Sequence, residues 1–129
     1  MSLLSTIGAS TNGAYPSMYF NSSGVIYYYV NSSDAITGST LSTGTWYHIA
    51  VCRSGTNTKM FINGTQVGST FSDSTNYGCG AQRPIIGGSD YYTGSQQNLV
   101  GYIDDFRITN GVARYTDNFT PPTASLPTY

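Results

Sequence analysis

"GTWYHIAVCRSGTNTKMFINGTQVGS", residues 44–69, contains three short runs of β-branched and aromatic residues separated by turn residues. In the second run Met60 and Ile62 fall on one face and Phe61 on the other. This period of two is expected of a β-strand with one buried and one partly exposed side. Asn63-Gly64 follows, and this dipeptide tolerates positive φ at both central positions of a type I′ hairpin turn. The stretch therefore predicts antiparallel strands joined by tight turns.

Similar runs occur along the rest of the chain and are bounded by Gly, Asn and Ser. The segments expected to form strands are 17–20, 25–30, 45–53, 58–63, 65–69, 83–88 and 99–109. "NSSG" at 21–24 has the length of a second hairpin loop. Short strands at regular spacing, with no amphipathic helix in the pattern, predict an all-β sandwich or barrel.

The composition limits the classes of protein to consider. A chain of 129 residues fits one domain and can bury about two thirds of the surface that its unfolded state exposes. Only 9% of the residues are charged and the formal net charge is −1, so the clustered Lys and Arg of a nucleic-acid binder are missing. The longest apolar run, 24–30, is far shorter than the roughly 20 residues of a membrane span. We therefore expect no nucleic-acid partner and no membrane insertion.

Three segments together resemble a known family. The opening stretch 44–69, "RPIIGG" at 83–88 and "GYIDDFRITNGVARYTDNFTPP" at 101–122 resemble, in this order, the motifs of laminin-G-like domains. The resemblance covers about residues 15–127 and implies an antiparallel two-sheet jelly-roll sandwich of the concanavalin A-like type. The closing form is similar to domains attached to bacteriophage tail proteins and marine bacterial surface proteins. It implies a virion-associated, extracellular or cell-surface location.

The chain departs from this family at its N-terminus. Members begin with two further strands, similar to "YFDGTGDYL" and "FTIEFWV", ahead of the region that matches residue 1. We therefore expect one domain over 1–129, truncated at the N-terminus relative to the family, with "LLSTIGAS" at 3–10 rearranged. Either the chain is part of a longer product or a partner strand, for example from another copy, fills the gap. The Pro-rich residues 118–129 are expected to form an extended exit segment.

Tyrosines beside amides and hydroxyls point to carbohydrate recognition, because a sugar stacks its C–H face on aromatic rings and pairs its hydroxyls with planar polar groups. The candidate ligand-binding residues are Tyr77, Asp90, Tyr91, Tyr92, Gln96, Gln97 and Asn98. The alternative is that they form an uncharged, salt-tolerant surface. In "VIYYYV" at 25–30 both faces of the predicted strand are apolar or aromatic, which indicates self-association through a covered second face.

Metal binding and catalysis are less well supported. Asp104 and Asp105 are candidate calcium ligands, since calcium prefers hard oxygens. The alternative is an ion pair between Asp105 and Arg107. A glycosidase needs two carboxylates across the scissile bond, whereas this chain has no Glu and its two adjacent aspartates would point to opposite faces of a strand. His48, the only histidine, is expected to be a hydrogen-bonded structural residue.

The two cysteines, Cys52 and Cys79, allow one disulfide or two free thiols, and the strand pattern around Cys52 favours the thiols. Taken together, the residues and the resemblance favour a non-enzymatic binding module for weak carbohydrate or surface recognition. A structural or oligomerisation module with protein-protein contacts is the alternative, and a glycan-cleaving enzyme is third.

Overall fold

The computed structural model describes residues 1–6, 15–77, 84–89 and 97–126. All regular secondary structure in these residues is β. The strands are β1 (Ser2–Ser5), β2 (Ser17–Phe20), β3 (Val25–Val30), β4 (Ser33–Thr40), β5 (Ile49–Ser54), β6 (Asn57–Ile62), β7 (Thr65–Ser72) and β8 (Ile85–Ile86). No helix in the described residues is long and apolar enough to cross a membrane.

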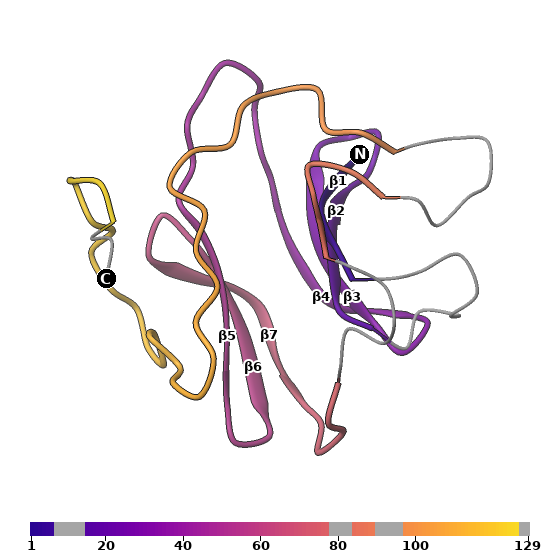
Figure 1. The fold of residues 1–129 in the computed structure, drawn as a ribbon, viewed down its shortest axis with the longest axis vertical. Coiled ribbons are helices and arrows are strands. Elements are labelled where there is room, and N and C mark those ends of the chain that lie inside the picture. The colour runs from indigo at the N-terminus through magenta and orange to yellow at the C-terminus, as the bar shows by residue number, and fades with distance from the viewer. Residues whose placement is uncertain (7–14, 78–83, 90–96, 127–129) are drawn as a thin grey trace.

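The strands form two antiparallel sheets (Figure 1). The first sheet has five strands in the order β4-β3-β2-β1-β8, and the second has three in the order β5-β6-β7. Consecutive strands β2, β3 and β4 are neighbours, as are β5, β6 and β7, so each sheet grows mainly by hairpins. The prediction of an all-β, two-sheet sandwich is confirmed.

The core lies between the sheets and follows from the alternation in β3. Ile26, Tyr28 and Val30 are buried, while the residues between them are half-buried on the opposite face. Ile36 of β4 and Met60 of β6 close the same cluster. Each large apolar side chain removed from water contributes about 1.5–3 kcal/mol, which makes this cluster the main source of stability. Burial also raises the pKa of Tyr28 to about 12, because it disfavours the charged phenolate.

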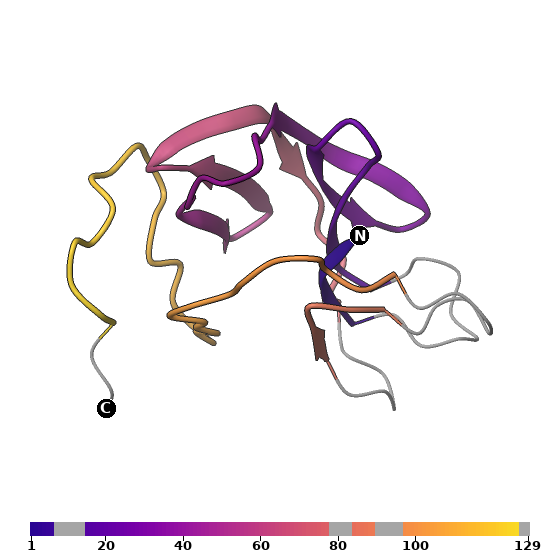
Figure 2. The ribbon, with the colours of Figure 1, turned by 90° about the horizontal axis from the view of Figure 1, so that it is seen from above.

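The two sheets meet where β7 crosses β4 (Figure 2). At this point Gly68 has φ +65, and a Cβ there would lie 2.5 Å from the carbonyl oxygen of Thr37 and 2.7 Å from Cγ2 of Ile36. No side chain fits between the two backbones, so glycine is required both for its conformation and for its size. The segment after residue 97 crosses from the first sheet to the second on the other side of the molecule (Figure 2).

Two strands were not expected from the sequence. β1 pairs with both β2 and β8, so the start of the chain lies inside the five-stranded sheet. β4 follows β3 through a two-residue turn in which Asn31 and Ser32 have φ of 52° and 60°. Positive φ at both central residues is the type I′ pattern, but without a glycine the turn gives a weak sequence signal.

The predicted hairpin at Asn63-Gly64 is confirmed, with φ of 50° and 78° between β6 and β7. The prediction that one side of β6 is partly exposed is wrong at Phe61, which is fully buried. Its ring lies 5.5 Å from that of Phe119, and the Phe119 amide donates to the Gly64 carbonyl at 2.9 Å. The C-terminal segment therefore covers the outer face of the second sheet.

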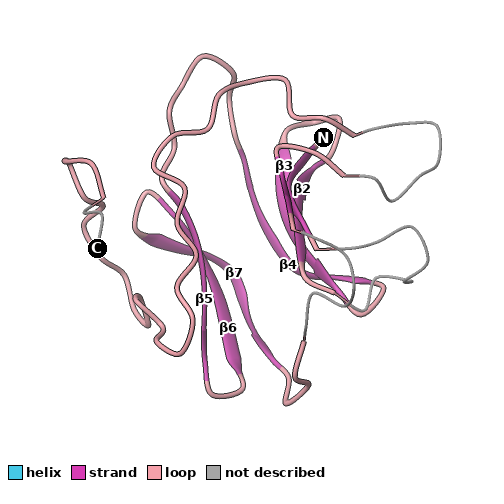
Figure 3. Cartoon of the chain, viewed as in Figure 1, coloured by secondary structure: helices cyan, strands magenta, loops and turns pink. Residues whose placement is uncertain are grey.

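The predicted strand at 99–109 is not formed (Figure 3). These residues run as loop, and Asp105 has φ +50, which interrupts an extended backbone. A strand needs a neighbour that supplies hydrogen bonds, and no strand of either sheet pairs with this segment in the described residues. The strand predicted at 45–53 likewise begins only at Ile49.

Replacement of Gly68 tests the junction between the sheets. Gly68→Ala combines a strained backbone with a collision against β4, so we expect it to lower the free energy of unfolding by about 3 kcal/mol. Gly55→Ala is the matched control because Gly55 has φ +59 but no atom near its would-be Cβ. We expect about 1 kcal/mol for this control. Urea unfolding measures the free energy of unfolding of both variants. Equal losses would contradict the close contact between β7 and β4 at Gly68.

Candidate functional site

Tyr77, the first residue of the predicted ligand-binding loops, lies just after β7. Its hydroxyl donates to the Asp73 carboxylate. The guanidinium of Arg53 lies 5.7 Å from the centre of the Tyr77 ring and donates to the carbonyl oxygens of Asp73 and Thr75. The hydrogen bond from Tyr77 and those from Thr75 lower the pKa of Asp73 to about 2. These contacts hold the loop after β7 against the end of β5.

Gln97 and Asn98 lie elsewhere, beside β1 and β8. The Ser2 amide donates to the Gln97 carbonyl at 2.9 Å. The Asn98 Oδ1 atom lies 3.0 Å from where a Cβ on Gly88 would be, so this side chain sits over the Gly87-Gly88 turn. Tyr77 is held by Arg53 and Asp73, whereas Gln97 lies against β1. The other candidates, Asp90, Tyr91, Tyr92 and Gln96, lie outside the described residues.

Asp104 and Asp105 are both exposed and lie in loop rather than in a strand. Asp104 Oδ1 accepts a hydrogen bond from the Asp105 amide at 2.8 Å. Together with His48 and Ile49, they line a depression of about 140 Å³. The described residues contain no group of three or more His, Cys, Asp or Glu side chains arranged for a metal ion. Two carboxylates alone supply fewer oxygens than the six to eight that calcium takes.

His48 and Cys52 have structural surroundings. The His48 ring packs edge-on against the rings of Tyr115 and Phe119, at 6.1 and 5.5 Å. Its buried Nδ1 atom has no hydrogen-bond partner in the described chain, so the expected hydrogen bond to the ring is not found there. Cys52 is a half-buried free thiol, and Cys79 lies outside the described residues.

The most developed surface is the outer face of the five-stranded sheet, which we call the tyrosine face. It consists of Tyr19 on β2, Tyr27 and Tyr29 on β3, and the flanking polar residues Asn21 and Asp34. The rings of Tyr19 and Tyr27, which are cross-strand neighbours, stack with centres 5.1 Å apart and planes 15° apart. The ring of Tyr29 meets that of Tyr19 edge-on at 6.2 Å. All three rings are half-buried.

Polar groups fix the edges of the tyrosine face. The Tyr19 hydroxyl donates to Asp34 Oδ1 at 2.7 Å, and the Asn21 side-chain amide donates to the Tyr27 hydroxyl at 3.3 Å. Burial, followed by the bond to Asp34, raises the pKa of Tyr19 well above its ordinary value. The face thus presents neutral hydroxyls, an amide and a carboxylate around aromatic carbon. Such a surface can contact both the C–H and the O–H groups of a sugar.

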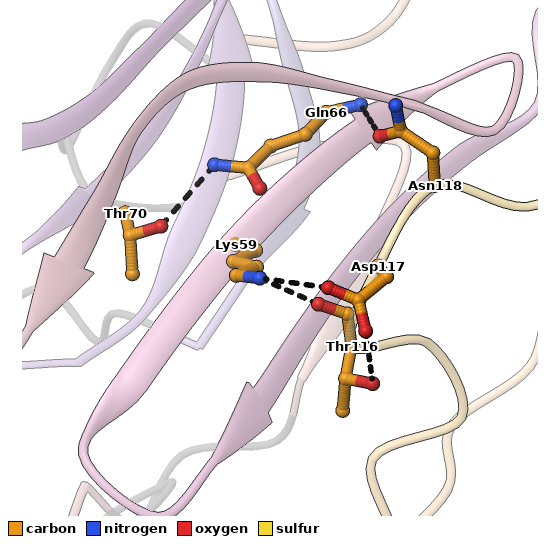
Figure 4. A network of polar contacts seen from close by, with 6 residues as sticks. All are labelled: Lys59, Gln66, Thr70, Thr116, Asp117 and Asn118. Carbon is orange, nitrogen blue, oxygen red and sulfur yellow. Dashed lines mark hydrogen bonds and ion pairs between the residues drawn. The ribbon is translucent and has the colours of Figure 1, made fainter.

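A second polar surface lies where the C-terminal segment crosses β6 (Figure 4). Lys59, the only lysine, donates to the Thr116 carbonyl at 2.5 Å and lies 3.5 Å from Asp117 Oδ1. The Gln66 amide donates to Asn118 Oδ1 at 2.9 Å. Lys59, Asp117 and the ring of Tyr115 border a depression of about 210 Å³. Because the Lys59 ammonium and the Asp117 carboxylate bind each other, these contacts serve first to anchor the C-terminal segment.

The sequence interpretation overlooked the tyrosine face as a binding site. It placed Tyr27 and Tyr29 on one strand face, which is confirmed, but interpreted that face as a sign of self-association. The contributions of Tyr19 and Asp34 depend on the register of β2 and β4 against β3. The one available signal was Tyr19 in the same alternating pattern across the "NSSG" turn.

Comparison with known proteins gives a family match. Residues 2–115 match a laminin G family described as the concanavalin A-like lectin/glucanases superfamily. The chain is 27% identical to the crystal structure of residues 221–444 of an S-layer domain-containing protein from Clostridium thermocellum. That match has a TM-score of 0.42 and covers 88% of this chain. It covers 62% of the other chain, so this chain spans less than two thirds of the length of that structure. No curated protein matches the chain.

Because the pKa of Tyr19 is raised in the folded chain, the free energy of unfolding depends on pH in the alkaline range. Above pH 10 the unfolded chain releases the Tyr19 proton while the folded chain retains it, so stability falls as pH rises. Tyr19→Phe removes this proton, and we expect a shallower fall between pH 10 and 11.5, measured by urea unfolding. Tyr102→Phe, at a ring that is 88% exposed, is the control and should keep the wild-type slope. Identical slopes for all three proteins would contradict the assignment.

Proposed function

This chain belongs to a laminin G family of the concanavalin A-like lectin/glucanases superfamily, and from that membership we propose that it is a non-catalytic module for weak carbohydrate recognition. The observation that carries the proposal is the tyrosine face, where three aromatic rings meet an amide and a carboxylate. This combination of apolar carbon and hydrogen-bonding edges suits a polyhydroxylated ligand.

The tyrosine face favours a neutral sugar. Its only charged side chain, Asp34, already accepts the Tyr19 hydroxyl, and its free lone pairs can accept hydroxyls from a ligand. Tyr27 receives its hydrogen bond from Asn21 and so retains its own hydroxyl proton for donation. A shallow face of half-buried rings buries little of a ligand compared with a deep pocket, which fits weak binding.

The loops predicted from the sequence form a second proposed contact region. Tyr77, Asp90, Tyr91, Tyr92, Gln96, Gln97 and Asn98 would extend sugar contacts beyond the tyrosine face. Calcium at Asp104 and Asp105 is a further proposal, in which other oxygens complete the coordination. Neither proposal is needed for recognition at the tyrosine face.

A binding role is favoured over catalysis because the chain contains no Glu. Glycoside hydrolysis uses a pair of carboxyl groups, and the adjacent Asp104 and Asp105 lie on an exposed loop beside His48 and Ile49. We place the module in a virion or cell-surface protein, as its closing sequence "GYIDDFRITNGVARYTDNFTPP" resembles domains of such proteins. The alternative of a structural module with protein-protein contacts is supported by the position of β5, which pairs only with β6 in the described residues.

A glycan array tests carbohydrate recognition, followed by titration of the sugars that bind. We expect neutral glycans to bind with Kd near the millimolar range, and Tyr27→Ala to raise Kd by about tenfold through loss of about 1.4 kcal/mol of aromatic contact. Tyr102→Ala removes an equally large ring outside the tyrosine face and should leave Kd unchanged. Absence of binding at millimolar sugar would overturn the proposal.

Two further experiments use the same protein samples. Repeating the titration in EDTA tests the calcium site, because lost binding supports it and unchanged binding contradicts it. Incubation with laminarin or agarose tests catalysis. We expect no new reducing ends, and their release would contradict the non-catalytic assignment.

A further inference from the structure

The sequence contains three Asn-Gly pairs, the dipeptide at which a chain most readily loses the side-chain amide of asparagine. In this reaction the backbone nitrogen of the glycine attacks Cγ of the asparagine. Glycine permits the attack because it has no side chain to hinder the approach and has the widest choice of backbone angles. Asn12-Gly13 lies outside the described residues, whereas Asn63-Gly64 and Asn110-Gly111 are described. The surroundings of these two pairs therefore decide which of them can react in the folded chain.

Asn63 is held through both its side chain and its backbone. Its Oδ1 atom accepts a hydrogen bond from the His48 amide at 2.9 Å, and its own amide donates to the His48 carbonyl at 2.8 Å. Gly64 is buried, and its carbonyl accepts from the Phe119 amide at 2.9 Å. These contacts fix the side chain and the following peptide group in one arrangement. Asn63 Cγ can meet the Gly64 nitrogen only when the turn opens, which costs free energy in a hydrogen-bonded part of a fold.

Asn110-Gly111 has none of these restraints. Both residues are exposed and lie in loop. Within the described ranges the Asn110 side chain forms no hydrogen bond, and neither residue takes part in a backbone hydrogen bond. Gly111 has φ +84, and no atom lies within 4 Å of where its Cβ would be. The loop is closed only by the side chains on either side of the pair, where Arg114 Nε donates to Thr109 Oγ1 at 2.7 Å. The Asn110 side chain can therefore rotate without breaking a contact.

From this contrast we propose that Asn110 is a site of spontaneous modification, at which the folded protein converts asparagine to aspartate and isoaspartate. The Gly111 nitrogen forms a bond to Asn110 Cγ, the Cγ–Nδ2 bond breaks, and Nδ2 leaves as ammonia with the proton of the Gly111 amide. The product is a five-membered succinimide ring. Water then cleaves one of the two carbonyl–nitrogen bonds of the ring. Cleavage at Cγ gives aspartate, and cleavage at the backbone carbonyl gives isoaspartate, in which the chain continues through Cγ.

The modification changes the charge of the loop and leaves the sheets intact. It adds one carboxylate, so the formal net charge falls from −1 to −2. The new charge lies in the loop that carries the Arg114 guanidinium, and opposite charges attract. Isoaspartate also lengthens the backbone by one carbon atom, which a loop outside both sheets can absorb. The reaction needs only water, so the modified fraction increases with the age of the molecule. The inference does not depend on carbohydrate binding.

Mass spectrometry after trypsin digestion tests the site. The protein is incubated in mildly alkaline buffer, both folded and in urea above its unfolding transition. Peptide 108–114, "ITNGVAR", contains Asn110 as its only asparagine, and fragment ions assign Asn63 within its own peptide. In urea the two Asn-Gly pairs should react at similar rates. In the folded protein Asn110 should keep this rate, whereas Asn63 should react at least about tenfold more slowly. Equal rates at the two sites in the folded protein, or a tenfold slowing of Asn110 on folding, would overturn the proposal.

Ion-exchange chromatography of the folded protein tests the added charge, in an Asn12→Gln background that removes the Asn-Gly pair outside the described residues. The main peak of this protein should convert with time to a more acidic peak. Adding Asn110→Gln should abolish most of the conversion, because the longer side chain has to close a less favourable six-membered ring. Circular dichroism should be the same for both proteins, since the Asn110 side chain is exposed and makes no hydrogen bond in the described structure. An acidic peak that grows equally fast with Asn110→Gln would overturn the assignment.

Discussion

The close crossing of β7 over β4 sets the geometry on which the rest of the chain depends. Gly68 allows the two backbones to meet with no side chain between them, so the sheets join along one side. The apolar faces of β3 and β6 then form a single core between them. Because β4 and β7 are the strands that meet, β5 and β8 become the far edges of the sheets. In the described residues β6 is the one strand that pairs with β5.

The sequence predicted the features that depend on local pattern. It did not predict the features that depend on contacts between distant segments. The alternation in β3 identified its buried and outer faces, and Asn63-Gly64 identified a turn. β4 was missed because its turn has no glycine and its residues are mostly small and polar. The segment 99–109 has a strand pattern, but a strand pattern becomes a strand only when a neighbour offers hydrogen bonds. Burial of Phe61 required the C-terminal segment to fold back over it.

The candidate site shows the same division. Loop composition drew attention to Tyr77, Gln97 and Asn98, yet in the structure Tyr77 lies apart from the other two and its hydroxyl is held by Asp73. The tyrosine face instead arises from pairing, because Tyr19 stacks on Tyr27 only in the register that the β2-β3 turn imposes. Residues that are eight positions apart in the sequence become a continuous aromatic surface through this register. Composition alone cannot show which of twelve tyrosines will meet.

The position of the tyrosine face bears on how a weak site could serve a surface protein. It lies on the outer side of the five-stranded sheet, whereas the β5 edge belongs to the other sheet. Several tyrosine faces presented together on one surface would make binding of the second site to a repetitive glycan intramolecular, and avidity can then exceed the single-site affinity by about 10²–10⁴ when the spacing fits. Weak binding at one shallow aromatic face is therefore compatible with recognition at a surface.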